Sequence, residues 1–117
     1  DTSVLTACAN DFGFESVFAR QIEALGRDGD LLLGFSTSGT SVNVLRAFEM
    51  AARIGMHTIL IGGADQGTIG PLAGQVILVP SSDVARVQEM HGVIGHILVE
   101  IVEDRIFRKT KSGESNA

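Results

Sequence analysis

The sequence has no tryptophan and no tyrosine, and it contains a single cysteine, Cys8, among its 117 residues. Six phenylalanines are the only aromatic residues, which argues against a platform that stacks bases or sugars. One cysteine cannot form an internal disulfide and favours a reducing compartment. The chain opens on Asp1 without the basic region of a signal peptide, so we expect a cytoplasmic protein. The longest apolar run is only a few residues, which predicts no contact with a membrane through a spanning helix.

Positive charge is also in short supply. Nine Lys and Arg stand against 14 Asp and Glu, which gives a formal net charge of −5 and argues against nucleic-acid binding through bulk charge. Hydrophobic residues make up 44% and charged residues 20%, a balance that excludes a disordered chain. The length fits one domain with its own core, expected over residues 1–109, followed by a polar, flexible tail over residues 110–117.

The spacing of the apolar residues alternates along the chain between strand-like runs and helical periods. Two glycines, Gly26 and Gly55, are expected to end helices, and Pro80 is expected to stop the last strand. The expected strands span residues 4–7, 31–35, 58–61 and 76–79, and the expected helices span residues 14–25, 44–54 and 82–107. Apolar strands that alternate with helices predict an α/β fold, a three-layer sandwich in which helices flank a parallel sheet.

Residues 36–41, Ser-Thr-Ser-Gly-Thr-Ser, are termed the serine turn here and connect an expected strand to an expected helix. Open α/β sheets bind ligands at the carboxyl ends of their strands, and a helix N-terminus presents free N–H groups to an anion. Five hydroxyls in six residues add donors for phosphate oxygens, while Gly39 permits close approach of the backbone. The turn has no Lys, so it is not a P-loop. The alternative is a capped helix, although capping needs fewer hydroxyls.

The last expected helix carries Gln88, His91 and His96. At 100° per residue, His96 lies about 80° from Gln88, so the two can share one face, whereas His91 lies about 60° to the other side. A histidine there could act as a general base or bind a divalent metal, but two residues do not complete a metal site. The alternative, which the residues alone favour, is a partly buried, hydrogen-bonded helix residue. Farther upstream, Asn10 and Asp11 precede the first expected helix, and Asp11 is expected to cap it.

Three blocks of sequence resemble the sugar isomerase (SIS) domain, and most closely the phosphoheptose isomerase family. They are residues 5–13 (LTACANDFG), residues 33–41 (LGFSTSGTS), and residues 86–91 (RVQEMH) with residues 96–98 (HIL). With the helices between them, they cover nearly all of residues 3–104. The resemblance implies a flavodoxin-like SIS fold of which this chain is the C-terminal two thirds, with the N-terminal part missing.

The resemblance also implies a reaction. The family converts sedoheptulose 7-phosphate to D-glycero-D-manno-heptose 7-phosphate through an enediol, an early step towards lipopolysaccharide, in cytoplasmic homotetramers with sites at subunit contacts. Gln88 and His96 match positions linked to zinc, and His96 matches the catalytic base. The residues that match contacts to the sugar-phosphate substrate are Asn10, Asp11, Ser36, Thr37, Ser38, Ser41 and Gln88.

Some family features are not found in these residues. Family members carry an upstream glycine-serine loop and a His and a Glu that complete the metal and acid/base set, and Ala85 stands where some members have an Asp. We therefore expect this segment alone to carry half a site. Two alternatives stay open: a non-catalytic SIS protein that binds a sugar phosphate or a replication-initiator partner, and a sugar-phosphate-sensing regulatory domain.

Overall fold

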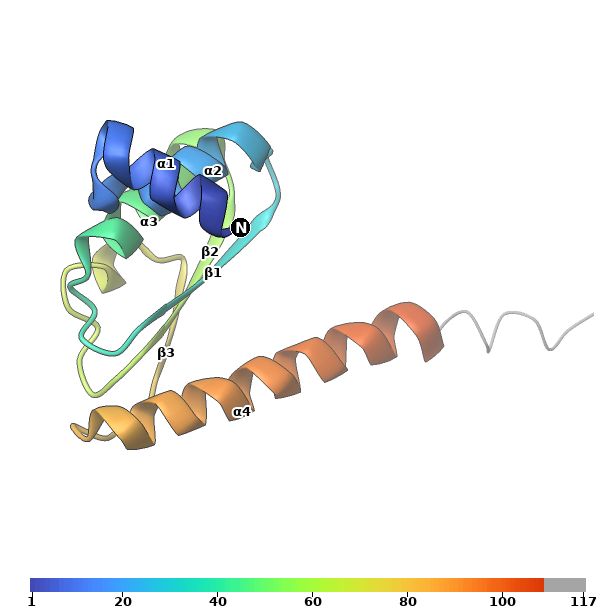
Figure 1. Cartoon of the computed structure of the whole chain (residues 1–117). Coiled ribbons are helices and arrows are strands. Elements are labelled where there is room, and N and C mark those ends of the chain that lie inside the picture. The colour runs from blue at the N-terminus through green and yellow to red at the C-terminus, as the bar shows by residue number, and fades with distance from the viewer. Residues whose placement is uncertain (109–117) are drawn as a thin grey trace, which may run out of the picture.

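The computed structural model describes residues 1–108 and contains a parallel sheet with helices on both sides (Figure 1). The tail expected over residues 110–117 lies outside the described residues. The elements follow in the order α1 (Thr2–Phe12), a 3-10 turn (Phe14–Ser16), α2 (Val17–Leu25), β1 (Leu31–Ser36), α3 (Val42–Ile54), β2 (His57–Gly62), a 3-10 turn (Gly70–Leu72), β3 (Gln75–Leu78), α4 (Val84–Glu103) and a π-helical turn (Asp104–Arg108).

The three strands lie in the order β1-β2-β3, and both pairs are parallel. Ser36, the last residue of β1, is the partner of Gly62, the last residue of β2, and Gly62 in turn pairs with Leu78 at the end of β3. The carboxyl ends of all three strands therefore lie in one row. Because ligands of α/β proteins bind at that edge, the register brings the segments that follow the strands to one place.

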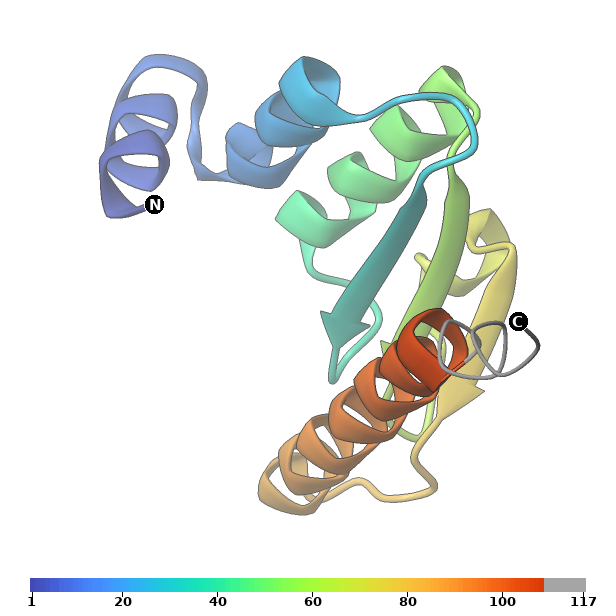
Figure 2. The ribbon, with the colours of Figure 1, turned by 90° about the vertical axis from the view of Figure 1, so that its right-hand side faces the viewer.

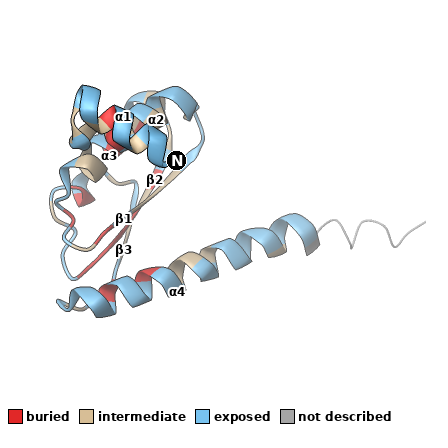
Figure 3. Ribbon diagram, in the orientation of Figure 1, coloured by how far each residue is buried: buried red, intermediate tan, exposed pale blue. Residues whose placement is uncertain are grey.

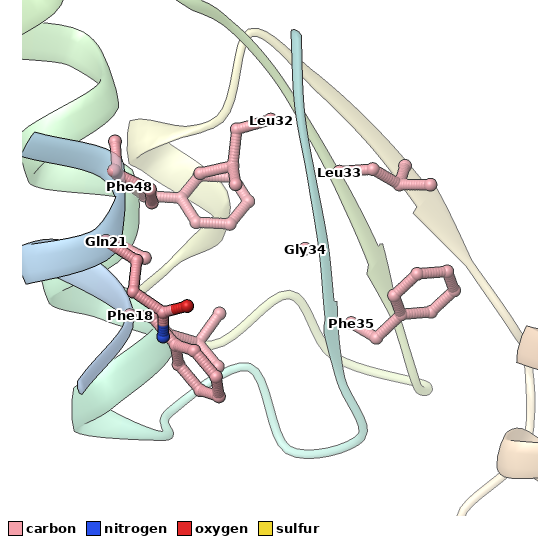
Figure 4. A pocket seen from close by; sticks show the side chains of 10 residues that line it. Phe18, Gln21, Leu32, Leu33, Gly34, Phe35 and Phe48 are labelled. Atoms are coloured by element: carbon pink, nitrogen blue, oxygen red, sulfur yellow. The ribbon is translucent and has the colours of Figure 1, made fainter. Parts of the chain in front are cut away.

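Alternating residues of β1 face two different helix layers (Figure 4). Leu32 packs towards α3, against the buried core of Phe48, Leu60 and Ile69, and a Cβ on Gly34 would run into the Phe48 ring. The residues between them, such as Phe35, point to the opposite face, which α4 covers near the carboxyl ends of the strands (Figure 2). The predicted α/β sandwich with three layers is therefore confirmed.

The strand predicted over residues 4–7 is wrong, since these residues belong to helix α1. The carboxylate of Asp1 accepts a hydrogen bond of 2.8 Å from the Ser3 amide and caps the helix, and Gly13, with φ of 87°, ends it. A run of four residues cannot separate a strand from a helix segment by its periodicity. The other predicted strands and helices are confirmed, including the end of α3 at Gly55, which has φ of 89°.

Helix α4 is long and little covered (Figure 3). The side chain of Asp83 caps its start by accepting a 2.9 Å hydrogen bond from the Ala85 amide. Only Val87 and His91 are buried among its 20 residues, and the later turns extend past the sheet (Figure 1). Over residues 1–108, no helix combines the length and the apolar character that a membrane crossing requires.

Candidate functional site

A cleft of about 780 Å³ lies between the end of β1 and helix α4, and we refer to it as the site cleft. Its apolar wall includes Leu33 and Phe35 from β1 and Val99 from α4. Its polar side chains come from two segments far apart in the sequence, namely Ser36, Thr37 and Ser41 of the serine turn and Gln88, His91 and His96 of α4. The fold thus brings a hydroxyl-rich turn opposite a pair of imidazoles and an amide.

The hydroxyls of the serine turn differ in what they bind. Ser36 is buried, and its Oγ accepts a 3.1 Å hydrogen bond from the Gly39 amide and lies 3.5 Å from the Ser41 hydroxyl. Ser38 is exposed, does not line the cleft, and accepts hydrogen bonds from the amide and the hydroxyl of Thr40 at 3.2 and 3.0 Å. Ser41 is the N-cap residue of α3, yet its hydroxyl makes no capping hydrogen bond. Capping therefore does not account for the Ser41 hydroxyl.

A second loop, residues 65–69, supports the serine turn from behind and is termed the supporting loop. Gly39 and Gly67 both have positive φ, at 65° and 55°, and they pack against each other. A Cβ on Gly39 would meet the backbone of Gln66, and a Cβ on Gly67 would meet the Gly39 carbonyl. That carbonyl accepts a 3.0 Å hydrogen bond from the Ile69 amide. Gly39 was expected to admit a ligand to the backbone, but the space beside its Cα is filled by the supporting loop.

On the other side of the cleft, α4 presents Gln88 and His96 as exposed side chains. His91 is 8% exposed, its Nε2 lies 3.0 Å from the Gly62 carbonyl oxygen, and its ring centroid is 5.6 Å from that of Phe35. His91 therefore fits the interpretation of a buried, hydrogen-bonded helix residue. It also lines the cleft together with His96, although helix spacing had placed the two histidines on different sides of α4.

Asn10 and Asp11 do not lie at the site cleft of their own chain. Both are exposed near the end of α1, where the Asn10 amide donates a 2.9 Å hydrogen bond to the Asp11 carboxylate. The prediction that Asp11 caps the following helix is wrong, because α1 continues to Phe12 and the N-cap of α2 is Ser16. The error follows from the missed helix α1.

The described residues do not complete a zinc site by themselves. Within residues 1–108, no three or more His, Cys, Asp or Glu side chains are grouped so that they could hold a metal ion. Gln88 and His96 supply at most two donors to the cleft, whereas a catalytic zinc has three protein ligands. Any zinc bound in the cleft would need further ligands from outside the described residues.

A second cavity, of about 380 Å³, lies between α2, α3 and β1 (Figure 4). Its walls are almost entirely apolar, and its one polar side chain, Gln21, donates a 2.8 Å hydrogen bond to the Val17 carbonyl within α2. The cavity offers no acid, base or nucleophile. Of the two, only the site cleft has side chains that could bind an anion and move a proton.

Known proteins resemble this chain in both sequence and structure. A family model described as SIS domain matches residues 2–63. A phosphoheptose isomerase from Helicobacter pylori is 51% identical over 109 residues, which cover 93% of this chain and 57% of that protein. A phosphoheptose isomerase from a Nitratiruptor species is 55% identical over 104 residues, which cover 89% of this chain and 56% of that protein.

Two solved structures share the fold. The structure of a phosphoheptose isomerase from Francisella tularensis matches with a TM-score of 0.85 and 36% identity over 89% of this chain and 56% of that one. That of phosphoheptose isomerase GmhA from Neisseria gonorrhoeae matches with a TM-score of 0.84 and 43% identity over 87% of this chain and 58% of that one. The chain thus spans little more than half the length of its relatives. Since the family model covers just over half of the sequence, and the parallel sheet ends in a serine turn, the chain belongs to the SIS domain family.

Proposed function

We propose that the full-length protein is a phosphoheptose isomerase that converts sedoheptulose 7-phosphate to D-glycero-D-manno-heptose 7-phosphate. The observation that carries the proposal is the site cleft, in which the serine turn faces Gln88 and His96. Relatives that are 51% and 55% identical to this chain over the aligned residues are named phosphoheptose isomerases. The product would serve lipopolysaccharide synthesis.

The serine turn would bind the phosphate group. Ser36, Thr37 and Ser41 line the cleft, and Ser38 is exposed in the same turn, so several hydroxyl donors precede the N-terminus of α3. The N-terminus of α3 adds free amides and a partial positive charge, which favour an anion. Because the turn contains no Lys or Arg, neutral donors would hold the phosphate, which suits a substrate that must also leave.

His96 would act as the base of the isomerisation. Moving a proton between two adjacent carbons requires a group that takes the proton from one carbon and returns it to the next. His96 is exposed within the site cleft, on the wall opposite the serine turn, so a sugar phosphate held at the turn can extend towards its imidazole. Gln88, on the same wall, would donate to or accept from a substrate hydroxyl.

Asn10 and Asp11 stay proposed substrate contacts, with one condition. Since neither residue lines the cleft of its own chain, they would reach a substrate only in the cleft of a second copy. An exposed apolar surface on α4 supports such an assembly, which we propose to be a cytoplasmic homotetramer. The exposed apolar residues of this surface are Val93, Ile97 and Ile101.

We also propose that Gln88 and His96 contribute to a zinc site whose remaining ligands lie outside the described residues. When bound, zinc would polarise the substrate oxygens. Metal analysis of the purified full-length protein tests this, and the double variant Gln88→Ala with His96→Ala should lose the metal. Full metal content in that variant would show that zinc is held elsewhere.

The function is tested by incubating the full-length protein with sedoheptulose 7-phosphate and separating the heptose phosphates by chromatography. Formation of the aldose phosphate supports the proposal. Binding of the sugar phosphate in calorimetry without any turnover would instead favour the non-catalytic SIS alternative. The absence of both binding and turnover would overturn the assignment of the site.

A further inference from the structure

We infer that His91 is a positioning residue, which fixes α4 to the sheet so that His96 and Gln88 face the serine turn; the inference rests on the proposed function. The Nε2 of His91 lies 3.0 Å from the carbonyl oxygen of Gly62. A carbonyl only accepts hydrogen bonds, so His91 donates through Nε2–H. With 8% of its surface exposed, the side chain is shielded from water that could compete for this bond.

The acceptor, the Gly62 carbonyl, lies at the carboxyl end of β2, next to the serine turn. Gly62 ends β2 and is the register partner of Ser36, the first residue of the serine turn. Its carbonyl also accepts a 3.2 Å hydrogen bond from the Val79 amide. The His91 bond therefore links α4, which carries the proposed base, to the end of β2. That end lies beside Ser36, where the proposed phosphate site begins.

Few other contacts hold α4 in place. Val87 and His91 are its only buried residues, and within the described part of α4 only the His91 side chain hydrogen-bonds to the sheet. The ion pair of Arg86 with Glu89 lies within the helix and is more than half exposed, so it does not anchor α4 to the sheet. The Phe35 ring packs beside the imidazole at a centroid distance of 5.6 Å.

A small movement of α4 would matter for the reaction. His96 follows His91 by five residues, or about 7.5 Å along the helix. A tilt of about 8° around His91 would displace His96 by roughly 1 Å, and a misplacement of that size can lower a rate by about 10²-fold. The serine turn, which is held by the supporting loop, would not move with α4. Loss of the His91 bond should therefore lower kcat much more than it raises KM.

Variants of His91 in the full-length protein separate positioning from mere stability. His91→Leu removes the donor, whereas His91→Gln keeps a donor that can reach the Gly62 carbonyl. We expect kcat to fall about 10–100-fold in His91→Leu with KM changed less than about threefold, and His91→Gln to recover most of the loss. His57→Leu is the matched control, because His57 is exposed at the opposite end of β2, and its kcat should stay that of the wild type.

A wild-type kcat in folded His91→Leu would overturn the inference, and so would a His91→Gln variant as slow as His91→Leu. If the wild-type protein itself does not isomerise the substrate, the proposed function fails, and histidine side-chain NMR then tests the positioning role without activity. The ¹⁵N signals should show His91 protonated at Nε2, and His91→Gln should leave the His96 signals in place. Protonation of His91 at Nδ1 alone would contradict the proposed bond. This measurement uses the wild-type protein and therefore holds even if His91→Leu does not fold.

Discussion

The two walls of the site cleft are built in different ways. The serine turn is held by backbone hydrogen bonds and by two glycines in contact, with Ser36 and Gly39 buried. Helix α4 carries Gln88 and His96 as exposed side chains and rests on the sheet through two buried residues. The fold itself thus determines the shape of the wall formed by the serine turn, whereas the wall formed by α4 depends on a few side-chain contacts. Changes in the turn should affect substrate binding, and changes in α4 should affect turnover.

The largest expected effect comes from His96, the proposed base. In the full-length protein, His96→Asn should lower kcat by at least about 10²-fold, because general acid–base help is worth about 10²–10⁴-fold. Substrate affinity should change little, since the serine turn is intact. Steady-state kinetics with calorimetry measure both quantities, and His57→Asn, at the far end of β2, is the control that should behave as the wild type. Normal turnover in His96→Asn would refute its role.

The next effect concerns the contact between the supporting loop and the serine turn. Gly67→Ala places a Cβ against the Gly39 carbonyl and puts Ala in the left-handed region, which alone costs about 1–2 kcal/mol. Gly29→Ala is the matched control, because Gly29 also has positive φ but has open space around its Cα. Denaturant unfolding should show a larger loss for Gly67→Ala, and only this variant should weaken sugar-phosphate binding. Equal losses of stability and of sugar-phosphate binding in the two variants would contradict the supporting role of the loop.

Within the serine turn, the two serines should differ. Ser36→Ala removes the acceptor of the buried Gly39 amide as well as a cleft hydroxyl, so sugar-phosphate binding in calorimetry should weaken by about 1–3 kcal/mol. Ser38→Ala should weaken it by about 1 kcal/mol, because Ser38 is exposed and bonded to Thr40. If neither variant changes the affinity, the turn does not bind the phosphate.

The smallest expected effect is on the surface of α4. Arg86→Ala breaks the 2.8 Å ion pair with Glu89, whose side chains are 61% and 59% exposed. Such exposed pairs contribute about 0–1 kcal/mol, so the free energy of unfolding should fall by no more than about 0.5 kcal/mol, and kcat should not change. A large loss of activity would mean that this pair, rather than His91, orients the helix.

Sequence patterns predicted most of the fold because its strands are uninterrupted apolar runs and its helices keep a regular period. The serine turn could be located from its hydroxyls and its place after a strand. The strand predicted at residues 4–7 was wrong since four residues carry too little periodicity, and the interpretation of Asp11 was wrong for the same reason. Helix spacing placed Gln88 and His96 on one face but could not show what that face meets.

Contacts between distant residues were beyond sequence patterns. The bond of His91 to Gly62 joins residues 29 apart, and Thr68 approaches the Gly39 carbonyl over the same separation. Periodicity describes which side of an element is apolar, not which backbone atom lies against it. The one available signal for the supporting loop was its single glycine, since Gly67 in a polar loop indicates a left-handed turn or a close approach of backbone.

A crystal structure of the full-length protein with sedoheptulose 7-phosphate tests the central claim most directly. The account predicts the phosphate group within about 3 Å of the hydroxyls and amides of residues 36–41, and a sugar carbon or its hydroxyl within about 3.5 Å of the His96 imidazole. A phosphate bound away from the serine turn, or a sugar that extends away from α4, would contradict the account.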